Sequence, residues 1–336
     1  MFKKVLLVVI FPVSFVGIVK LLSFSATDTV VLPDQEYTQL ISENYNVFAL
    51  PIPDELNFAG EPVPVDNFEV RERFDRELLV NTYWQSQTLL FFKRANRWFP
   101  LIERVLQEQG VPDDFKYLAL IESGLMNEIS PAGAAGYWQI LQSTGRELGL
   151  EVNTEVDERY HVEKATVAAC SFLKSAYQRY NSWTLAAAAY NMGRSGLNRQ
   201  ITNQQVTSYY DLWLNDETSR YVFRILAIKT IFENPSAHGF RFRQEDLYQP
   251  FEYYTVKVDT TINDLVAFAH AHHITYKELR TLNPWLRRTS LPNRSGKEYE
   301  IKITKESLFG HQQPIIVEEV EDNGLIMDSP ARDTDL

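Results

Sequence analysis

One glutamate, set in an apolar stretch, is the residue of this sequence best suited to chemistry. Glu122 follows an apolar run that begins at Phe115, and Leu118, Ile121 and Leu125 lie one helical turn or less away from it. Glutamate is rarely buried without a partner, and loss of water raises the pKa of a carboxyl group. Glu122 is therefore a candidate general acid that stays protonated near neutral pH. The alternative is a surface glutamate at a helix end.

Three further clusters carry aromatic, amide or carboxylate groups suited to binding sugars. They are Tyr137-Trp138-Gln139, Tyr190-Asn191 and Glu217-Thr218. The first offers flat apolar surface and an amide, and the second places a phenol and an amide at a helix end. Each cluster taken alone also fits packing or capping. Glu217, for example, fits a first-turn acid stabilised by the helix dipole.

The sequence predicts neither a metal nor another cofactor. His270, His272 and His273 lie close together, but adjacent histidines point away from each other on a helix and no carboxylate sits at ligand spacing. A solvated face explains them better. Cys170 is the only cysteine, which excludes an internal disulfide and a cysteine-based zinc site.

Helices must position most of these groups. Apolar residues recur at helical spacing from about residue 70, and Asn234-Pro235 stops the last helix of the series. We therefore predict an all-α domain over 70–245. After Pro250 the pattern changes to strand, helix, helix and strand, which predicts a separate module over 252–304. The fold class is mainly α, with a small βααβ module.

The two ends of the chain differ from its middle. Residues 1–26 begin with basic residues and continue as an apolar run, as in a signal peptide or, if uncleaved, an N-terminal membrane anchor. The charge pattern places the N-terminus inside and the rest of the chain outside. Residues 27–69 contain five prolines and predict an extended linker that touches the surface in places. Residues 305–336 predict a disordered acidic tail.

Composition limits the class of partner. The 336 residues are 45% hydrophobic and 23% charged, as in a globular protein of two domains. The net charge of −11 argues against nucleic acid as a partner. We expect a monomer.

The clusters, taken in order, resemble the four motifs of lytic transglycosylases of glycoside hydrolase family 23, which share the goose-type lysozyme fold. The motifs are Glu122-Ser123, Gly136-Tyr137-Trp138-Gln139-Ile140, Ala189-Tyr190-Asn191-Met192-Gly193, and Glu217-Thr218 with Tyr221-Val222. The tryptophan before the glutamine in the second motif resembles the pattern of the membrane-bound type D subgroup. The module at 252–304 resembles a LysM domain through Tyr254-Thr255-Val256, Asp259-Thr260 and Asn283-Pro284, although Val258 replaces a usual glycine.

The resemblance implies peptidoglycan as substrate, in cell-wall remodelling on the periplasmic side of the envelope. Glu122 matches the single catalytic acid of the family. Ser130, Gln139, Tyr190 and Glu217 match positions that line the family's glycan groove, and Ser123, Tyr137 and Asn191 from the same region are further candidate substrate-binding residues.

The product depends on whether a second carboxylate works with Glu122. Ordinary glycosidases need two carboxyl groups, and the sequence pairs none with Glu122; Glu128 lies in a polar loop whose position the sequence leaves open. With one acid, the muramyl 6-hydroxyl attacks C1 and gives a 1,6-anhydro sugar. Two alternatives stay open: a muramidase that uses water, and a non-catalytic peptidoglycan-binding protein.

Overall fold

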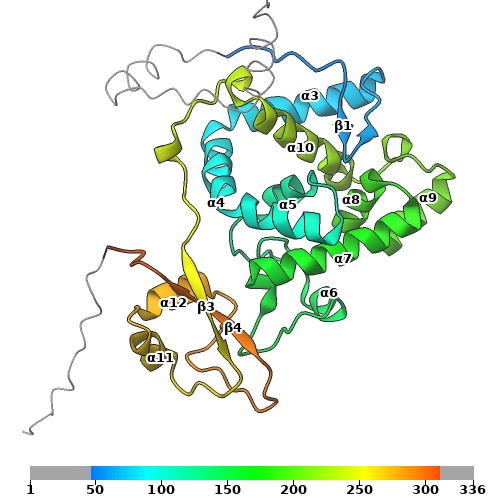
Figure 1. The fold of residues 1–336 in the computed structure, drawn as a ribbon. Coiled ribbons are helices and arrows are strands. Elements are labelled where there is room, and N and C mark those ends of the chain that lie inside the picture. Colours follow the sequence, from blue (N-terminus) through cyan, green and yellow to red (C-terminus); the bar gives the residue numbers. More distant parts are fainter. Residues whose placement is uncertain (1–46, 311–336) are drawn as a thin grey trace, which may run out of the picture. The chain divides into compact units, whose positions relative to one another are not determined.

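The computed structural model describes residues 47–310, which form two compact units (Figure 1). The first unit holds residues 47–152 and 157–250, and the second holds 153–156 together with residues from 251 onward. The predicted export or anchor segment at 1–26 lies outside the described residues. Within residues 47–310, no helix has the length and apolar character needed to cross a membrane.

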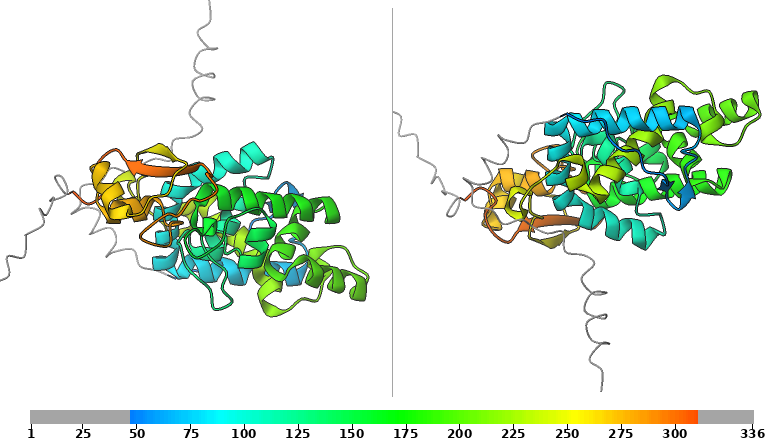
Figure 2. Two further views of the ribbon diagram at one scale, coloured as in Figure 1. Left: turned by 90° about the horizontal axis from the view of Figure 1, so that it is seen from below. Right: turned by 90° about the horizontal axis from the view of Figure 1, so that it is seen from above.

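The first unit is built from helices, as the apolar periodicity predicts. Helix α3 packs along α10, and α7 packs against both α4 and α8 (Figures 1 and 2). The helices are α3 (Phe68–Tyr83), α4 (Gln85–Gln109), α5 (Phe115–Ser123), α6 (Gln142–Glu147), α7 (Val162–Tyr180), α8 (Trp183–Met192), α9 (Arg194–Gln204) and α10 (Asp216–Glu233). Short 3-10 turns occupy Glu158–Tyr160, Tyr209–Asp211, Pro235–His238 and Gln244–Asp246.

Helix α5 is largely buried within this unit. It contacts α4 and α10, and Leu118, Ala119 and Leu120 are fully buried although they face different sides of the helix. A helix that is apolar all round is stable only when it is surrounded by other elements. The sequence of α5 therefore places its last residues, including Glu122, inside the domain.

The predicted linker is wrong for the residues just before α3. A short hairpin of β1 (Asn57–Phe58) and β2 (Glu61–Pro62) belongs to the first unit. Phe58 is fully buried, with its ring edge-to-face on Phe115 at 5.3 Å. The Glu61 carboxylate accepts hydrogen bonds from the N–H and hydroxyl of Thr184, in the first turn of α8, at 2.9 and 2.6 Å. Prolines interrupt regular structure here without preventing burial.

The second unit has the predicted βααβ order. Its elements are β3 (Tyr253–Val258), α11 (Leu265–Ala271), α12 (Tyr276–Leu282) and β4 (Tyr299–Thr304). The two strands pair antiparallel, from Tyr253 opposite Thr304 to Val258 opposite Tyr299. The buried Asn283 side chain bonds both the N–H and the C=O of Lys302, at 2.8 and 2.7 Å, and so joins the end of α12 to β4.

The first residues of the predicted disordered tail are attached to this unit. The Ser307 hydroxyl and the Leu308 N–H both donate to Oε1 of Glu278, at 2.9 and 2.8 Å. The prediction of disorder from residue 305 is therefore wrong for 305–310. Residues 311–336 lie outside the described part of the chain.

Candidate active site

Glu122 lies in the last turn of α5, and its carboxyl is removed from most of its water. Gly124 ends the helix in the left-handed conformation, with φ of +59°. A Cβ at Gly124 would lie 3.1 Å from the ring of Phe91 and 3.1 Å from the guanidinium of Arg94. Glycine therefore fits this left-handed turn better than any other residue. The chain thus turns away at once and leaves the acid at the end of a buried helix.

The surroundings of Glu122 favour its protonated form. Burial is the largest cause, and it raises the pKa of the carboxyl above the ordinary value. A hydrogen bond from Tyr221 and the positive charge of Arg224 act in the opposite direction, and the negative charge of Glu217 raises the pKa further. The net result is a raised pKa, as the apolar sequence around Glu122 predicts.

Tyr221 is the direct partner of the acid. Its hydroxyl donates to Oε1 of Glu122, across 99 residues of sequence, and its ring is buried on α10. Burial and the adjoining carboxylate raise the pKa of Tyr221 well above 10, so it remains a donor. The sequence analysis placed Tyr221 in the fourth motif but not among the site residues. The spacing of apolar residues does not show which side chains of α5 and α10 come into contact.

Tyr190 lies beside the same carboxyl and stays protonated. Its hydroxyl donates to the carbonyl of Trp138 at 2.7 Å, and its ring packs edge-to-face on Phe172 at 5.3 Å. Burial first, and the charge of Glu122 second, raise the pKa of Tyr190 well above 10. This bond ties α8 to the loop that carries the second motif.

The prediction that Tyr137 and Trp138 offer a flat aromatic surface to sugar rings is wrong. Tyr137 is 4% exposed, and its ring meets Trp98 edge-on at 4.9 Å. Trp138 is fully buried, and its indole N–H donates to the hydroxyl of Thr166 at 2.8 Å. Both rings hold the loop in place from inside. The sequence shows the aromatic types but not the direction in which the loop turns them.

Three other candidates also shape this loop. The buried Ser123 hydroxyl donates to the carbonyl of Tyr137 at 2.8 Å. Gln139 has a left-handed backbone, with φ of +46°, and its amide donates to the carbonyl of Glu128 at 3.1 Å. The Ser130 hydroxyl accepts the N–H of Ala134 at 3.1 Å. Direct contact of these residues with a glycan stays a prediction.

Arg159, which the sequence analysis did not single out, fastens the loop to the domain. Its guanidinium makes a two-pronged bond with Asp157, at 2.9 and 2.7 Å, and donates to the carbonyls of Gly133 and Ile140 at 2.9 and 3.1 Å. Such paired, charge-assisted bonds fix geometry firmly. A Cβ at Gly136 would come within 2.0 Å of the Arg159 carbonyl, so the loop lies directly on this backbone.

The third and fourth motifs meet next to the acid. Asn191 donates to Oε1 of Glu217 at 3.2 Å, and the Thr218 hydroxyl donates to Oδ1 of Asn191 at 2.7 Å. Glu217 is exposed, yet its charge acts on Glu122. Glu128 is not among the groups that shift the pKa of Glu122. Glu217 is therefore the better candidate for a second carboxylate.

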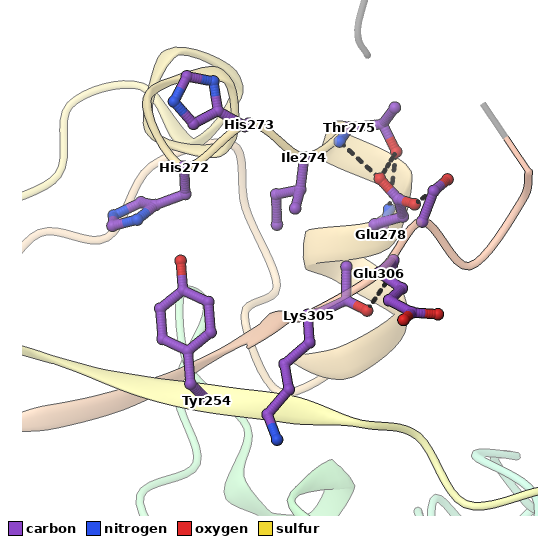
Figure 3. A pocket seen from close by; sticks show the side chains of 10 residues that line it. Tyr254, His272, His273, Ile274, Thr275, Glu278, Lys305 and Glu306 are labelled. Atoms are coloured by element: carbon purple, nitrogen blue, oxygen red, sulfur yellow. Dashed lines mark hydrogen bonds between the residues drawn. The ribbon is translucent and has the colours of Figure 1, made fainter. Parts of the chain in front are cut away.

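The second unit has a hollow of about 200 Å³ between the start of β3, the end of β4 and the α11–α12 turn (Figure 3). Tyr254, His272, Ile274 and Lys305 are among the side chains that line it. Burial, and secondarily the charge of His273, lowers the pKa of His272. Among residues 47–310, no group of His, Cys, Asp and Glu is arranged to hold a metal ion.

The chain matches two protein families over these units. Residues 100–212 match the transglycosylase SLT domain, and residues 254–307 match the soluble lytic transglycosylase C-terminal LysM-like domain. The protein thus combines an SLT domain with a LysM-like domain, which confirms the resemblance seen in its motifs.

The chain is similar to the membrane-bound lytic murein transglycosylase D of Escherichia coli strain K12, with 28% identity over 240 residues, 70% of this chain and 51% of the relative. The same protein from E. coli O6:H1 gives the same values. The chain thus spans about half the length of these relatives.

Two solved structures are also similar. The 70-kDa soluble lytic transglycosylase from E. coli gives a TM-score of 0.35 at 21% identity, over 41% of this chain and 24% of that chain. A complex of the 70-kDa soluble lytic transglycosylase with bulgecin A gives 0.38 at 16% identity, over 64% and 42%.

Proposed function

We propose that this protein is a peptidoglycan lytic transglycosylase that cleaves the β-1,4 bond between N-acetylmuramic acid and N-acetylglucosamine. The observation that carries the proposal is the half-buried Glu122 at the end of a buried helix, with its raised pKa and its bond from Tyr221, within an SLT domain. A general acid needs a proton to give at the working pH, and this environment shifts the pKa of Glu122 in that direction. The similarity to a membrane-bound lytic murein transglycosylase supports the same activity.

In the proposed reaction, Glu122 first protonates the glycosidic oxygen. Tyr221 occupies Oε1, which leaves Oε2 to carry the transferred proton. The carboxylate that results is stabilised by the Tyr221 hydroxyl and the charge of Arg224. It then accepts the proton of the muramyl 6-hydroxyl as that oxygen closes on C1. The product is a 1,6-anhydro sugar, and no water is consumed.

A muramidase reaction is the second candidate, because Glu217 is a carboxylate within electrostatic reach of Glu122. A carboxylate base across the sugar would activate water and give a reducing end. Digestion of purified sacculi distinguishes the two reactions by the mass of the products. The proposed reaction gives muropeptides lighter by one water than the muramidase products, whereas products with a reducing muramyl end would refute it.

We further infer that the protein works as a monomer on the periplasmic side of the cell envelope. The basic and apolar pattern of residues 1–26 supports export, with the segment either cleaved or kept as an anchor. The LysM-like unit is proposed to bind peptidoglycan. Fractionation of cells producing the full chain tests the location, and recovery in the cytosol would contradict it.

A further inference from the structure

We propose that Trp213 is a sugar-binding platform that extends the glycan site past Glu217. The inference rests on the proposed function, because it takes the ligand to be a peptidoglycan strand. Trp213 is 80% exposed in the connection between α9 and α10, whereas its neighbours Leu212 and Leu214 are 4% and 9% exposed. The largest apolar side chain of this connection is therefore turned outward between two buried anchors.

The backbone of Trp213 is fixed from both sides by one side chain. The N–H of Trp213 donates to Oε1 of Gln204 at 2.7 Å, and Nε2 of Gln204 donates to the carbonyl of Trp213 at 2.9 Å. Nε2 also donates to Gln200 at 3.0 Å. A ring held on an ordered backbone contributes more to affinity, because binding does not have to order the loop first.

The connection leads directly into the polar cluster beside the acid. Glu217 follows Trp213 by four residues, so their Cα atoms are at most about 14 Å apart. Glu217 accepts a hydrogen bond from Asn191, and its charge reaches Glu122. A glycan strand bound at the acid can therefore reach the indole ring within a few sugar units.

The chemistry around Trp213 favours a neutral sugar ring as its ligand. One face of a β-linked amino sugar consists of weakly positive C–H groups, and these complement the negative face of the indole. Asp211 and Asp216 are both exposed near the ring in sequence. Their charge disfavours an anionic membrane surface, which is the other common partner of an exposed tryptophan.

The test compares Trp213→Ala and Trp213→Phe with Trp84→Ala in the full chain. Trp84, at the α3–α4 junction of the same domain, is 61% exposed and serves as the matched control. The Trp213→Ala variant is expected to lose about five- to tenfold in kcat/KM on long glycan strands, mainly through KM, since one aromatic contact has a modest energy. Activity on fragments too short to reach the ring stays unchanged, and Trp213→Phe keeps part of the difference.

Three results would overturn the inference. They are unchanged activity of Trp213→Ala on long strands, an equal loss on short fragments, and an equal loss in Trp84→Ala. If the unmodified protein cleaves no peptidoglycan, the proposed function fails instead. In that case, retention of long strands by Glu122→Gln protein, with and without Trp213→Ala, decides whether the ring grips glycan: equal retention refutes the platform, and weaker retention supports it.

Discussion

Each unit of the protein carries a glutamate on a helix whose pKa is shifted, and the two pKa shifts have opposite directions. Glu122 in the SLT unit receives a hydrogen bond from the Tyr221 hydroxyl, and burial raises its pKa. Glu278 in the LysM-like unit is 2% exposed, yet its pKa is lowered. Burial also acts to raise the pKa of Glu278, but hydrogen bonds from Thr275, Ser307 and the N–H of Leu308 outweigh it.

The comparison shows that the number of donors, rather than burial alone, decides which form of a buried carboxyl is stable. Four donors surround Glu278, which completes the capping box with Thr275 at the start of α12 and holds the chain after β4. Its negative charge is satisfied, so it is a structural group. Glu122 lacks such a shell and favours its proton, and this is the condition for a general acid.

The largest expected effect is the loss of activity in Glu122→Gln. Glutamine keeps the size of the side chain but has no proton to transfer, so cleavage of sacculi should fall by roughly 10²- to 10⁴-fold or more. The thermal unfolding midpoint should not fall, because the amide oxygen of glutamine can still accept the hydrogen bond from Tyr221. Near-normal release of muropeptides by a well-folded variant would end the proposed mechanism.

The same substitution at Glu278 should show the opposite pattern. Glu278→Gln leaves buried donors without a full partner, which costs about 1–3 kcal/mol of the free energy of unfolding of the LysM-like unit. Cleavage of soluble glycan fragments should be unchanged. Urea unfolding followed through the NMR signal of the Trp285 indole, which is buried in this unit, measures the loss. A variant as stable as the unmodified protein would show that the shell of donors is dispensable.

Removal of the second unit should separate binding from chemistry. Truncation after Pro250 is expected to weaken retention on insoluble peptidoglycan by roughly tenfold, since one of two linked binding units is lost. Cleavage of soluble fragments should stay within the error of the full chain. An equal loss on both substrates would place the LysM-like unit in the catalytic fold.

The smallest effects concern the pH dependence of cleavage. In the proposed mechanism Glu122 must be protonated to act, so kcat/KM should fall as pH rises through its pKa. The Tyr221 bond lowers that pKa, and the Glu217 charge raises it. Tyr221→Phe should therefore move the alkaline limb to higher pH, and Glu217→Gln should move it to lower pH. If the alkaline limbs of the two variants move in the same direction, or each moves opposite to this expectation, Glu122 is not the group that sets the limb.

Stability should depend on pH in opposite directions at the two glutamates. The lowered pKa of Glu278 stabilises its unit above the ordinary value of 4.5, and this contribution is lost as pH falls. The raised pKa of Glu122 favours folding at low pH, and its contribution is lost as pH rises from about 4.5 through the folded-state pKa.

The sequence could predict the elements and the acid but not the inward-facing groups of the site. The apolar character of α5 and the motif around Glu122 are local, so both could be read along the chain. The contact of Tyr221 with Glu122 and the burial of Tyr137 and Trp138 depend on how distant helices pack. The local pattern of residues does not show which distant side chains come into contact.

The hairpin before α3 shows the same limit from another side. Its residues are proline-containing and polar, so local pattern favours a linker. Tertiary contacts decide otherwise: Lys229 on α10 donates to the carboxylate of Asp114 at 2.7 Å and to the carbonyl of Asn57 at 3.1 Å. A few long-range polar contacts thus convert a stretch that looks unstructured into part of the core.

Direct titration of the two carboxyl groups is the sharpest test of the central claim, which is that the surroundings of Glu122 raise the pKa of its carboxyl group. The protein is labelled with carbon-13 at the glutamate side-chain carboxyl, and each resonance is followed with pH. Signals are assigned by their loss in Glu122→Gln and in Glu278→Gln. The structure predicts that the Glu122 signal titrates above the ordinary value of 4.5 and the Glu278 signal below it. A Glu122 signal that titrates at or below 4.5 would contradict the account, because the residue would then have no proton to donate near neutral pH.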